Sequence, residues 1–455
     1  MEKQKTYLTF WQKVAYGSGD FGSNFFYMLL TSFAMLYLGN YVGLDVGIVG
    51  TLMAVSKLLD GITDVFFGRL IDKTNTRMGK ARPWMFFSAF PLALSLIFCF
   101  AIPASLPEVG KYAFFFVFYT AANALFYTAN NISYAAMTAY ITRNDSERVS
   151  LGTYRYIFAV VASVLVMSIT AVLVEQMGGD LAAWRNVAIL FAVVLLVFNS
   201  LASLSCKELP PVEEEPAAPQ ATETQPEKKE NFFTALKIIL TNKYYLLLLA
   251  IYLLLYCNTG LASNVGTFYF TYVIGDLSLM GLTSLSSFVM IVGLIANPIL
   301  VKRFGMYRVN LVSYLINALL CLMLIPFAYA GNLMVLVALS FVRSVIMAPL
   351  MGSINALVAE VGQNAYLKTH THVEGMMFSC SSIGMKVGSG LGAAVAGWLM
   401  SFAGYVNGAA TQPGSAVSMI KFCYAGLPFI MVVLMAVCLW RMKVVEENRK
   451  LSATV

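Results

Sequence analysis

The segment Cys206–Asn231, CKELPPVEEEPAAPQATETQPEKKEN, divides the chain of 455 residues into two apolar halves. It combines repeated prolines and charges with few apolar side chains. A stretch of this composition cannot bury enough apolar surface to fold on its own. We therefore predict a solvated linker over residues 206–231 that joins two units, residues 1–205 and 232–455. A regulatory docking role is the alternative to a plain tether.

Six apolar stretches lie on each side of this segment, and each is long enough to cross a membrane. A helix that spans the bilayer needs about 20 mostly apolar residues. Such stretches are found at residues 14–40, 46–68, 83–104, 112–141, 151–174 and 185–205, and then at 244–273, 281–301, 309–330, 333–358, 373–403 and 416–440. The sequence thus predicts an all-α membrane protein with twelve transmembrane helices in two six-helix bundles.

The composition excludes most other classes of protein. Hydrophobic residues make up 59% of the chain and charged residues 12%, against roughly 45–50% and 25% in soluble domains. The dispersed cysteines and the two histidines, His370 and His372, form no recognisable disulfide framework, metal site or redox motif. We find no nucleophile–base pair or phosphate-binding loop, so neither an enzyme nor a bound cofactor is expected.

The basic residues predict how the chain is oriented in the membrane. Of the 30 lysines and arginines, 23 fall in the N-terminus, the even-numbered loops, the linker and the C-terminus, and 3 fall on the opposite side. Because short cytoplasmic loops are enriched in Lys and Arg, we expect both termini in the cytoplasm. The net charge of +7 therefore reflects topology in a plasma (inner) membrane, and no nucleic acid partner is expected. No cleavable signal peptide is evident.

Seven ionisable side chains fall inside the predicted spans. Each would cost at least about 2.5–3.5 kcal/mol if it faced lipid. We therefore expect these side chains to face the protein interior or water and to pair with one another. They are Asp20, Lys57, Asp60, Asp64, Arg155, Arg343 and Lys386.

Three of these charges lie on one face of the second span. Lys57, Asp60 and Asp64 recur at i, i+3 and i+7, a spacing that aligns side chains on a helix. Two carboxylates one turn apart repel each other unless a cation or a proton relieves the repulsion. Lys57 can partly neutralise the pair, and Thr63 adds a hydroxyl oxygen. The pattern predicts a site for a coupling cation, and the alternative is a structural network of ion pairs.

Asp20 lies among three glycines in the sequence GSGDFG at residues 17–22. A carboxylate there suits sugar hydroxyls, which it can accept from in pairs. Pairing with Arg155 is the alternative, and the two roles are compatible. The polar cluster of the fourth span, residues 127–134, fits either a binding wall or contacts between helices.

Lys386 lies among small residues, in SSIGMKVGSGLG at residues 381–392. Small residues let helices approach closely, and a lysine among them must find an acid on another helix. We expect that acid to be Asp60, Asp64 or Asp20.

Several of these motifs together resemble one family, the glycoside–pentoside–hexuronide:cation symporters of the major facilitator superfamily, of which melibiose permease is the best-known member. The resemblance covers nearly the whole chain outside the linker. It rests on residues 17–22, Lys57-x-x-Asp60-x-x-x-Asp64, the basic loop 68–84, residues 130–134 with Tyr154-Arg155, and residues 386–398.

The resemblance implies a site for each substrate. The implied cation site consists of Asp60, Asp64, Thr63 and Thr128, with Lys57 as a charge-pairing residue. The implied sugar site consists of Asp20, Tyr27, Tyr127, Asn131, Arg155, Ser381, Ser382 and Lys386.

Four positions depart from melibiose permease. Gly19, Asn131 and Ala135 replace a basic residue, a sugar-binding carboxylate and a stacking tryptophan, so recognition of galactosides of that type is not expected. Thr63 replaces an amide that is associated with sodium use in that protein, so proton coupling fits the sequence at least as well as sodium coupling does. The lost carboxylate near Arg155 leaves an acidic sugar, such as a hexuronide, as one candidate substrate.

We therefore predict a monomeric secondary transporter in the lipid bilayer that couples a monovalent cation, H⁺ or Na⁺, to a sugar, glycoside or hexuronide by alternating access. Two alternatives on the same fold remain open. One is a membrane sugar sensor that does not transport. The other is a proton-driven exporter of amphiphiles or lysolipids.

Overall fold

The structure is a computed structural model, and it describes residues 6–209, 239–369 and 379–452. The regular elements named within these ranges are helices. Their bounds are α1 (Phe10–Met28), α2 (Ala34–Tyr37), α3 (Val46–Lys73), α4 (Arg82–Cys99), α5 (Glu108–Thr120), α6 (Thr128–Ile141), α7 (Asp145–Gln176), α8 (Leu181–Ser205), α10 (Lys243–Tyr269), α11 (Met280–Ser284), α12 (Ser286–Phe304), α13 (Met306–Ala330), α14 (Leu333–Thr369), α16 (Ser379–Phe402), α17 (Gly414–Lys421), α18 (Leu427–Arg441) and α19 (Val444–Ser452).

Short π-helical segments join some of these helices into longer spans. They are Leu29–Phe33, Leu38–Val42, Ala121–Tyr127, Phe270–Ile274 and Phe422–Gly426. Counted this way, the described residues hold 12 helices long and apolar enough to cross a membrane. The predicted class, an all-α membrane protein with twelve spans, is confirmed.

Some boundaries differ from those predicted. The first helix begins at Phe10, four residues before the apolar run, because Thr9 and Gln12 form a reciprocal capping box. The short helix α19 carries charges at both ends and was not predicted. His370, His372 and the beginning of the predicted span 373–403 lie outside the described residues.

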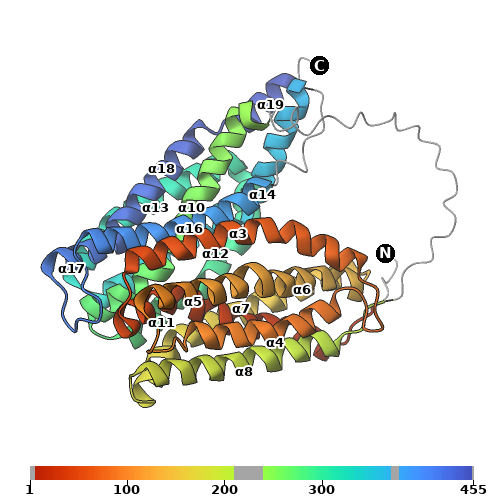
Figure 1. Ribbon diagram of the computed structural model, residues 1–455. Helices are drawn as coiled ribbons and strands as arrows, with labels where there is room; N and C mark the ends of the chain where they lie inside the picture. The colour runs from red at the N-terminus through yellow and green to blue at the C-terminus, as the bar shows by residue number, and fades with distance from the viewer. Residues whose placement is uncertain (1–5, 210–238, 370–378, 453–455) are drawn as a thin grey trace.

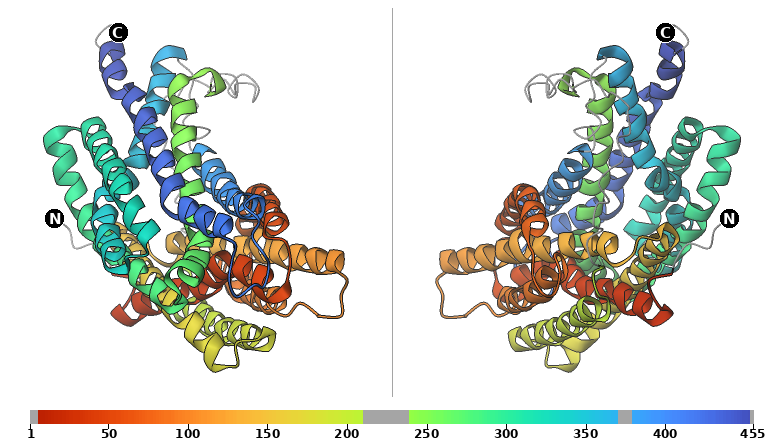
Figure 2. Two further views of the ribbon diagram at one scale, coloured as in Figure 1. Left: turned by 90° about the vertical axis from the view of Figure 1, so that its left-hand side faces the viewer. Right: turned by 90° about the vertical axis from the view of Figure 1, so that its right-hand side faces the viewer.

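The helices form two bundles that diverge toward one end (Figure 1). Helices α1–α8 make one bundle and α10–α19 the other, and Figure 2 views the molecule from the two sides of Figure 1. We call the end that borders the linker, near residues 209 and 239, the linker end. The opposite end, with the turns at residues 43–45 and 403–413, is the far end. The ribbons of the two bundles meet at the far end and separate at the linker end.

Helices α3 and α16 form the contact between the bundles toward the far end. A Cβ atom added at Gly397 would lie 2.2 Å from the carbonyl oxygen of Val46, so only glycine permits this approach. Trp398 Nε1 donates to Thr51 Oγ1 at 2.8 Å, and Ser401 Oγ donates to Asp45 Oδ2 at 3.0 Å. These contacts hold the far end closed.

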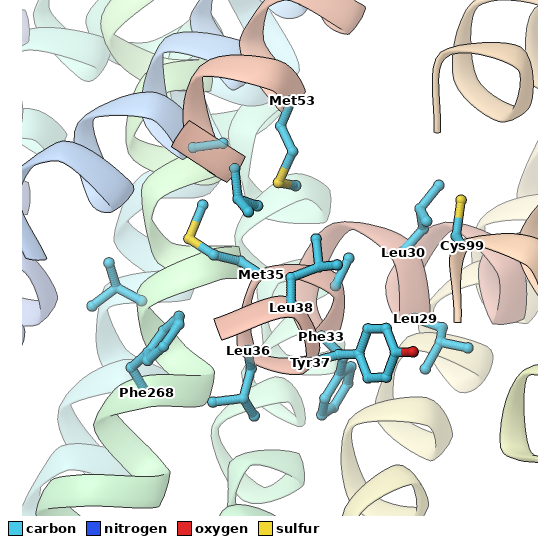
Figure 3. Packing of buried hydrophobic residues seen from close by; sticks show 14 of the residues in the cluster. Leu29, Leu30, Phe33, Met35, Leu36, Tyr37, Leu38, Met53, Cys99 and Phe268 are labelled. Atoms are coloured by element: carbon cyan, nitrogen blue, oxygen red, sulfur yellow. The ribbon is translucent and has the colours of Figure 1, made fainter. Parts of the chain in front are cut away.

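The largest buried apolar cluster also crosses between the bundles. Figure 3 shows Met35, Leu36 and Leu38 of the first span beside Phe268 of α10. Each of these side chains is at most 2% exposed. Lipid tails are as apolar as these side chains, so the hydrophobic effect does not drive this contact in a membrane. Tight packing of the side chains stabilises it instead.

Candidate functional site

Two carboxylates of α3 share one lysine of α16. Lys386 Nζ lies 3.1 Å from Asp60 Oδ1 and 2.6 Å from Asp64 Oδ2. It also donates to the carbonyl oxygen of Asp60 at 2.7 Å. The acid that we expected to pair with Lys386 is therefore a pair of acids on one helix of the other bundle. Of the three acids that we considered as partners of Lys386, Asp60 and Asp64 both pair with it. Asp20 pairs with Arg155 instead.

The charges in this cluster do not balance. Two carboxylates face one ammonium group, which leaves one negative charge when both acids are ionised. The Asp60 side chain is 10% exposed and that of Asp64 is 32% exposed. Asp64 is therefore within reach of water while Asp60 is enclosed. An arrangement of this kind suits a monovalent cation or a proton, because either one neutralises the remaining charge.

A third helix completes the surroundings of Asp60. Thr128 Oγ1 donates to Asp60 Oδ1 at 2.5 Å. Thr128 follows the π-helical segment Ala121–Tyr127, and such segments widen a helix and are frequent at functional sites. Thr63 Oγ1 instead donates to the backbone carbonyl of Asp60 at 3.0 Å. Of the two predicted hydroxyl ligands, Thr128 contacts the carboxylate, and no hydrogen bond of Thr63 to either carboxylate is formed.

The ammonium group of Lys57 contacts the π-helical segment Ala121–Tyr127. Its Nζ donates to Asn123 Oδ1 at 3.1 Å and lies 5.4 Å from the centre of the Tyr27 ring. We expected Lys57 to neutralise part of the acid pair, but the ammonium group turns toward the π-helical segment. Lys386 provides the neutralising charge in its place.

Asp20 and Arg155 form a half-buried ion pair between α1 and α7. Arg155 Nε lies 2.6 Å from Asp20 Oδ2, and Nη2 donates to Oδ1 at 3.4 Å. The guanidinium group stacks on the Tyr134 ring with its Cζ 4.0 Å from the ring centre. Tyr134 and Tyr16 fix this geometry, because each hydroxyl donates to the backbone carbonyl of the other residue.

A small chamber of about 130 Å³ lies beside Lys57, one turn before Asp60 on α3. Tyr27 lines it from α1, two turns beyond Asp20, and stacks on Tyr127 with ring centres 5.6 Å apart. The residues around the chamber come from both bundles. They are Tyr27, Thr31, Met53, Lys57, Tyr119, Tyr256, Thr259, Gly260, Ser263, Asn264, Met385, Ser389 and Ala393.

The remaining predicted sugar-site residues lie at the edges of this region. Asn131 is exposed on α6, one turn from Thr128. Ser381 and Ser382 lie about one turn before Lys386 on α16, and Ser382 is exposed. Arg343 lies outside the site, where its Nε donates to Asn317 Oδ1 at 3.2 Å.

Two bundles of membrane helices with a charged site between them are the arrangement of many secondary transporters. The chain belongs to the MFS/sugar transport protein family, whose sequence pattern matches residues 15–446. This match confirms the resemblance to the cation symporters of the major facilitator superfamily.

Relatives agree with this assignment, and solved structures share the fold. The isoprimeverose transporter of Lactiplantibacillus pentosus is 26% identical over 446 residues, which cover 97% of this chain and 90% of that protein. The inner membrane symporter YicJ of Escherichia coli is 26% identical, and the match covers 94% of this chain and 90% of that protein. Among solved structures, a bacterial homologue of the lysosomal transporter Spinster in an inward-facing conformation superposes with a TM-score of 0.67, at 13% identity over 96% and 98% of the two chains.

Sequence reasoning missed several residues of the site. Asn123 holds Lys57, and the support that Tyr134 of the predicted cluster 127–134 gives to Arg155 was not foreseen. The signal for Asn123 was present as a single amide within the apolar run AANALF. The face of α10 that lines the chamber was missed because its polar residues are spaced among leucines and read as an ordinary span.

Proposed function

We propose that the protein is a cation-coupled sugar symporter in which Asp60 and Asp64 bind the coupling ion and the ion competes with Lys386. The observation that carries this proposal is the bridge from Lys386 of one bundle to both carboxylates of the other. The family membership supports the transport of sugars, and the name of the isoprimeverose transporter supports a glycoside among the candidate substrates.

The competition couples ion binding to the movement of the bundles. When Na⁺ or H⁺ neutralises one carboxylate, Lys386 loses part of its attraction to α3. The bridge between the bundles weakens, and the bundles become free to rock about the central site. Ion binding thereby shifts the equilibrium between the two states, and the sugar must be bound as well for transport to be coupled.

The sugar site in this proposal is built around the Asp20–Arg155 pair. The carboxylate accepts hydrogen bonds from sugar hydroxyls, and the guanidinium group donates to them or to the carboxylate of a hexuronide. The stacked rings of Tyr27 and Tyr127 offer an apolar face to a sugar ring. Asn131 extends this wall along α6.

The excess of Lys and Arg near the linker end supports a cytoplasmic location for that end. With that orientation, the closed far end faces outward and the diverging linker end faces inward. The described conformation is then an inward-facing state, in which ion and sugar leave to the cytoplasm.

Uptake into proteoliposomes tests this function directly. A panel of radiolabelled disaccharides, monosaccharides and hexuronides is offered under an inward Na⁺ gradient, and separately under an inward H⁺ gradient in sodium-free buffer. We expect at least one sugar to accumulate above its external concentration under one of the two gradients. Binding without flux identifies a sensor, and the absence of gradient-driven accumulation for every sugar contradicts the proposal.

A further inference from the structure

One face of α10 brings polar side chains into the chamber from the second bundle. Tyr256, Thr259, Gly260, Ser263 and Asn264 all line it. Their spacing of i, i+3, i+4, i+7 and i+8 places them on a single stripe of the helix. The same chamber is lined from the first bundle by Tyr27 and Lys57. The stripe therefore faces the proposed sugar site across the boundary between the bundles.

Asn264 has an unused hydrogen-bond acceptor at this place. The residue is 2% exposed, and its Nδ2 donates to the carbonyl oxygen of Gly260 at 2.9 Å. Its buried Oδ1 accepts no hydrogen bond from the part of the chain that the structure describes. Buried polar atoms are nearly always paired, so an unpaired amide oxygen beside a cavity indicates that a ligand or water completes it.

Thr259 lies one turn before Ser263 and is exposed to the chamber. Its Oγ1 donates to the carbonyl oxygen of Leu255 at 3.0 Å, which leaves the hydroxyl oxygen free to accept. A Cβ atom at Gly260 would lie 2.3 Å from the Ser389 carbonyl oxygen, so α10 and α16 close the chamber on that side. The chamber thus ends at the stripe.

The size and position of the chamber indicate which part of a substrate it takes. Its volume of about 130 Å³ is close to that of a cavity of roughly 150 Å³ that holds a benzene ring. Tyr27 is seven residues from Asp20 on α1, a distance of roughly 10 Å along a helix axis. This spacing of about two helical turns matches two linked sugar rings better than a single ring.

We propose that Thr259 and Asn264 determine substrate specificity by binding the hydroxyls of an uncharged second ring, remote from the Asp20–Arg155 pair. The inference rests on the proposed function and narrows the substrate class to glycosides of two rings. The stripe offers only hydroxyl and amide groups. The one charged side chain of the chamber, Lys57, already donates to Asn123.

Sugar counterflow in proteoliposomes tests this inference, because it needs no ion gradient. Thr259→Val and Asn264→Leu remove the polar atoms and nearly keep the volume. Thr271→Val is the matched control, because Thr271 lies in the same span and its Oγ1 likewise donates to a carbonyl oxygen four residues earlier, but it does not line the chamber. The probes are the disaccharide with the strongest wild-type counterflow, its two component monosaccharides, and its singly deoxygenated derivatives.

We expect each stripe variant to bind the disaccharide about 3- to 10-fold more weakly than the wild type. Affinity for the monosaccharide that corresponds to the ring at Asp20 should stay unchanged. The wild type should bind one deoxygenated derivative more weakly than the parent sugar, whereas the variant should bind these two sugars equally well. A purely structural role of the residue does not produce this coupling.

Two outcomes overturn the inference. If the wild type exchanges disaccharides and both stripe variants match Thr271→Val, the stripe does not bind substrate, and the proposed function stands without it. If the wild type exchanges monosaccharides alone, or no sugar at all, the two-ring assignment fails, and in the second case the proposed function fails with it. Thr259→Val keeps the test decisive even where Asn264→Leu fails to fold, because Thr259 is exposed.

Discussion

Gly397 controls how closely the two bundles approach at the far end, and we predict that Gly397→Ala opens that end. The added Cβ would lie 2.2 Å from the carbonyl oxygen of Val46 and 3.3 Å from Cα of Gly47. The first distance is more than 1 Å inside ordinary van der Waals contact. Because both atoms belong to the backbone, α3 and α16 must move apart. Overpacking of this kind costs about 1–3 kcal/mol.

That cost falls on the closed far end alone, so it shifts the conformational equilibrium. An energy of about 1–3 kcal/mol changes the ratio of closed to open states by a factor of roughly 5 to 150. The assay is the labelling rate of a cysteine at Val49, which is fully buried on α3, with a membrane-impermeant maleimide. The native cysteines are replaced beforehand. Labelling should accelerate by the same factor, and net transport should slow.

Gly152→Ala is the matched control, because Gly152 is also helical and a Cβ there would meet nothing within 4 Å. Its labelling rate should equal that of the parent protein. If Gly397→Ala labels no faster than Gly152→Ala, the contact between α3 and α16 does not hold the far end closed.

Three further substitutions test other contacts. Thr128→Val removes a hydrogen bond that stabilises the ionised Asp60 carboxylate, worth about 1.5–3 kcal/mol, so a coupling proton should bind more tightly and the H⁺ concentration for half-maximal uptake should fall about tenfold or more while sugar counterflow persists. Arg155→Lys loses the planar stacking on Tyr134 and the second donor. Sugar affinity measured by counterflow should therefore fall at least about tenfold, and unchanged affinity removes Arg155 from the site. Glu208→Ala removes a carboxylate that accepts three backbone N–H groups at the beginning of α4. It should cost about 1 kcal/mol, seen as a lower unfolding temperature in detergent with an unchanged transport rate.

The sequence was sufficient to predict the fold class because the signal is physical and local. A span of about 20 apolar residues has few alternatives in a bilayer. The pairing of Lys386 with acids of another helix was also predictable, since a lone charge at that depth needs a partner. The i, i+3, i+7 spacing placed Asp60 and Asp64 on one face, and the structure brings both to the same lysine.

Contacts between distant helices were not predictable in detail. The sequence left open which of three acids pairs with Lys386, and the packing of α16 on α3 brings Asp60 and Asp64 to it. The π-helical segment Ala121–Tyr127 turns Asn123 toward Lys57, and no local pattern in the sequence indicates such a segment. The stripe on α10 was hidden for a similar reason, because small polar residues are common wherever membrane helices pack.

The role of the two acids in coupling is the central claim, and one pair of measurements on Asp60→Asn and Asp64→Asn tests it most directly. Sugar counterflow and gradient-driven accumulation are measured in the same proteoliposomes, with the wild type beside them. A monovalent ion that enters down 100 mV gains about 2.3 kcal/mol, enough for roughly 50-fold accumulation. We predict that both variants lose this accumulation and retain counterflow. Accumulation at the wild-type level by either variant would contradict the account.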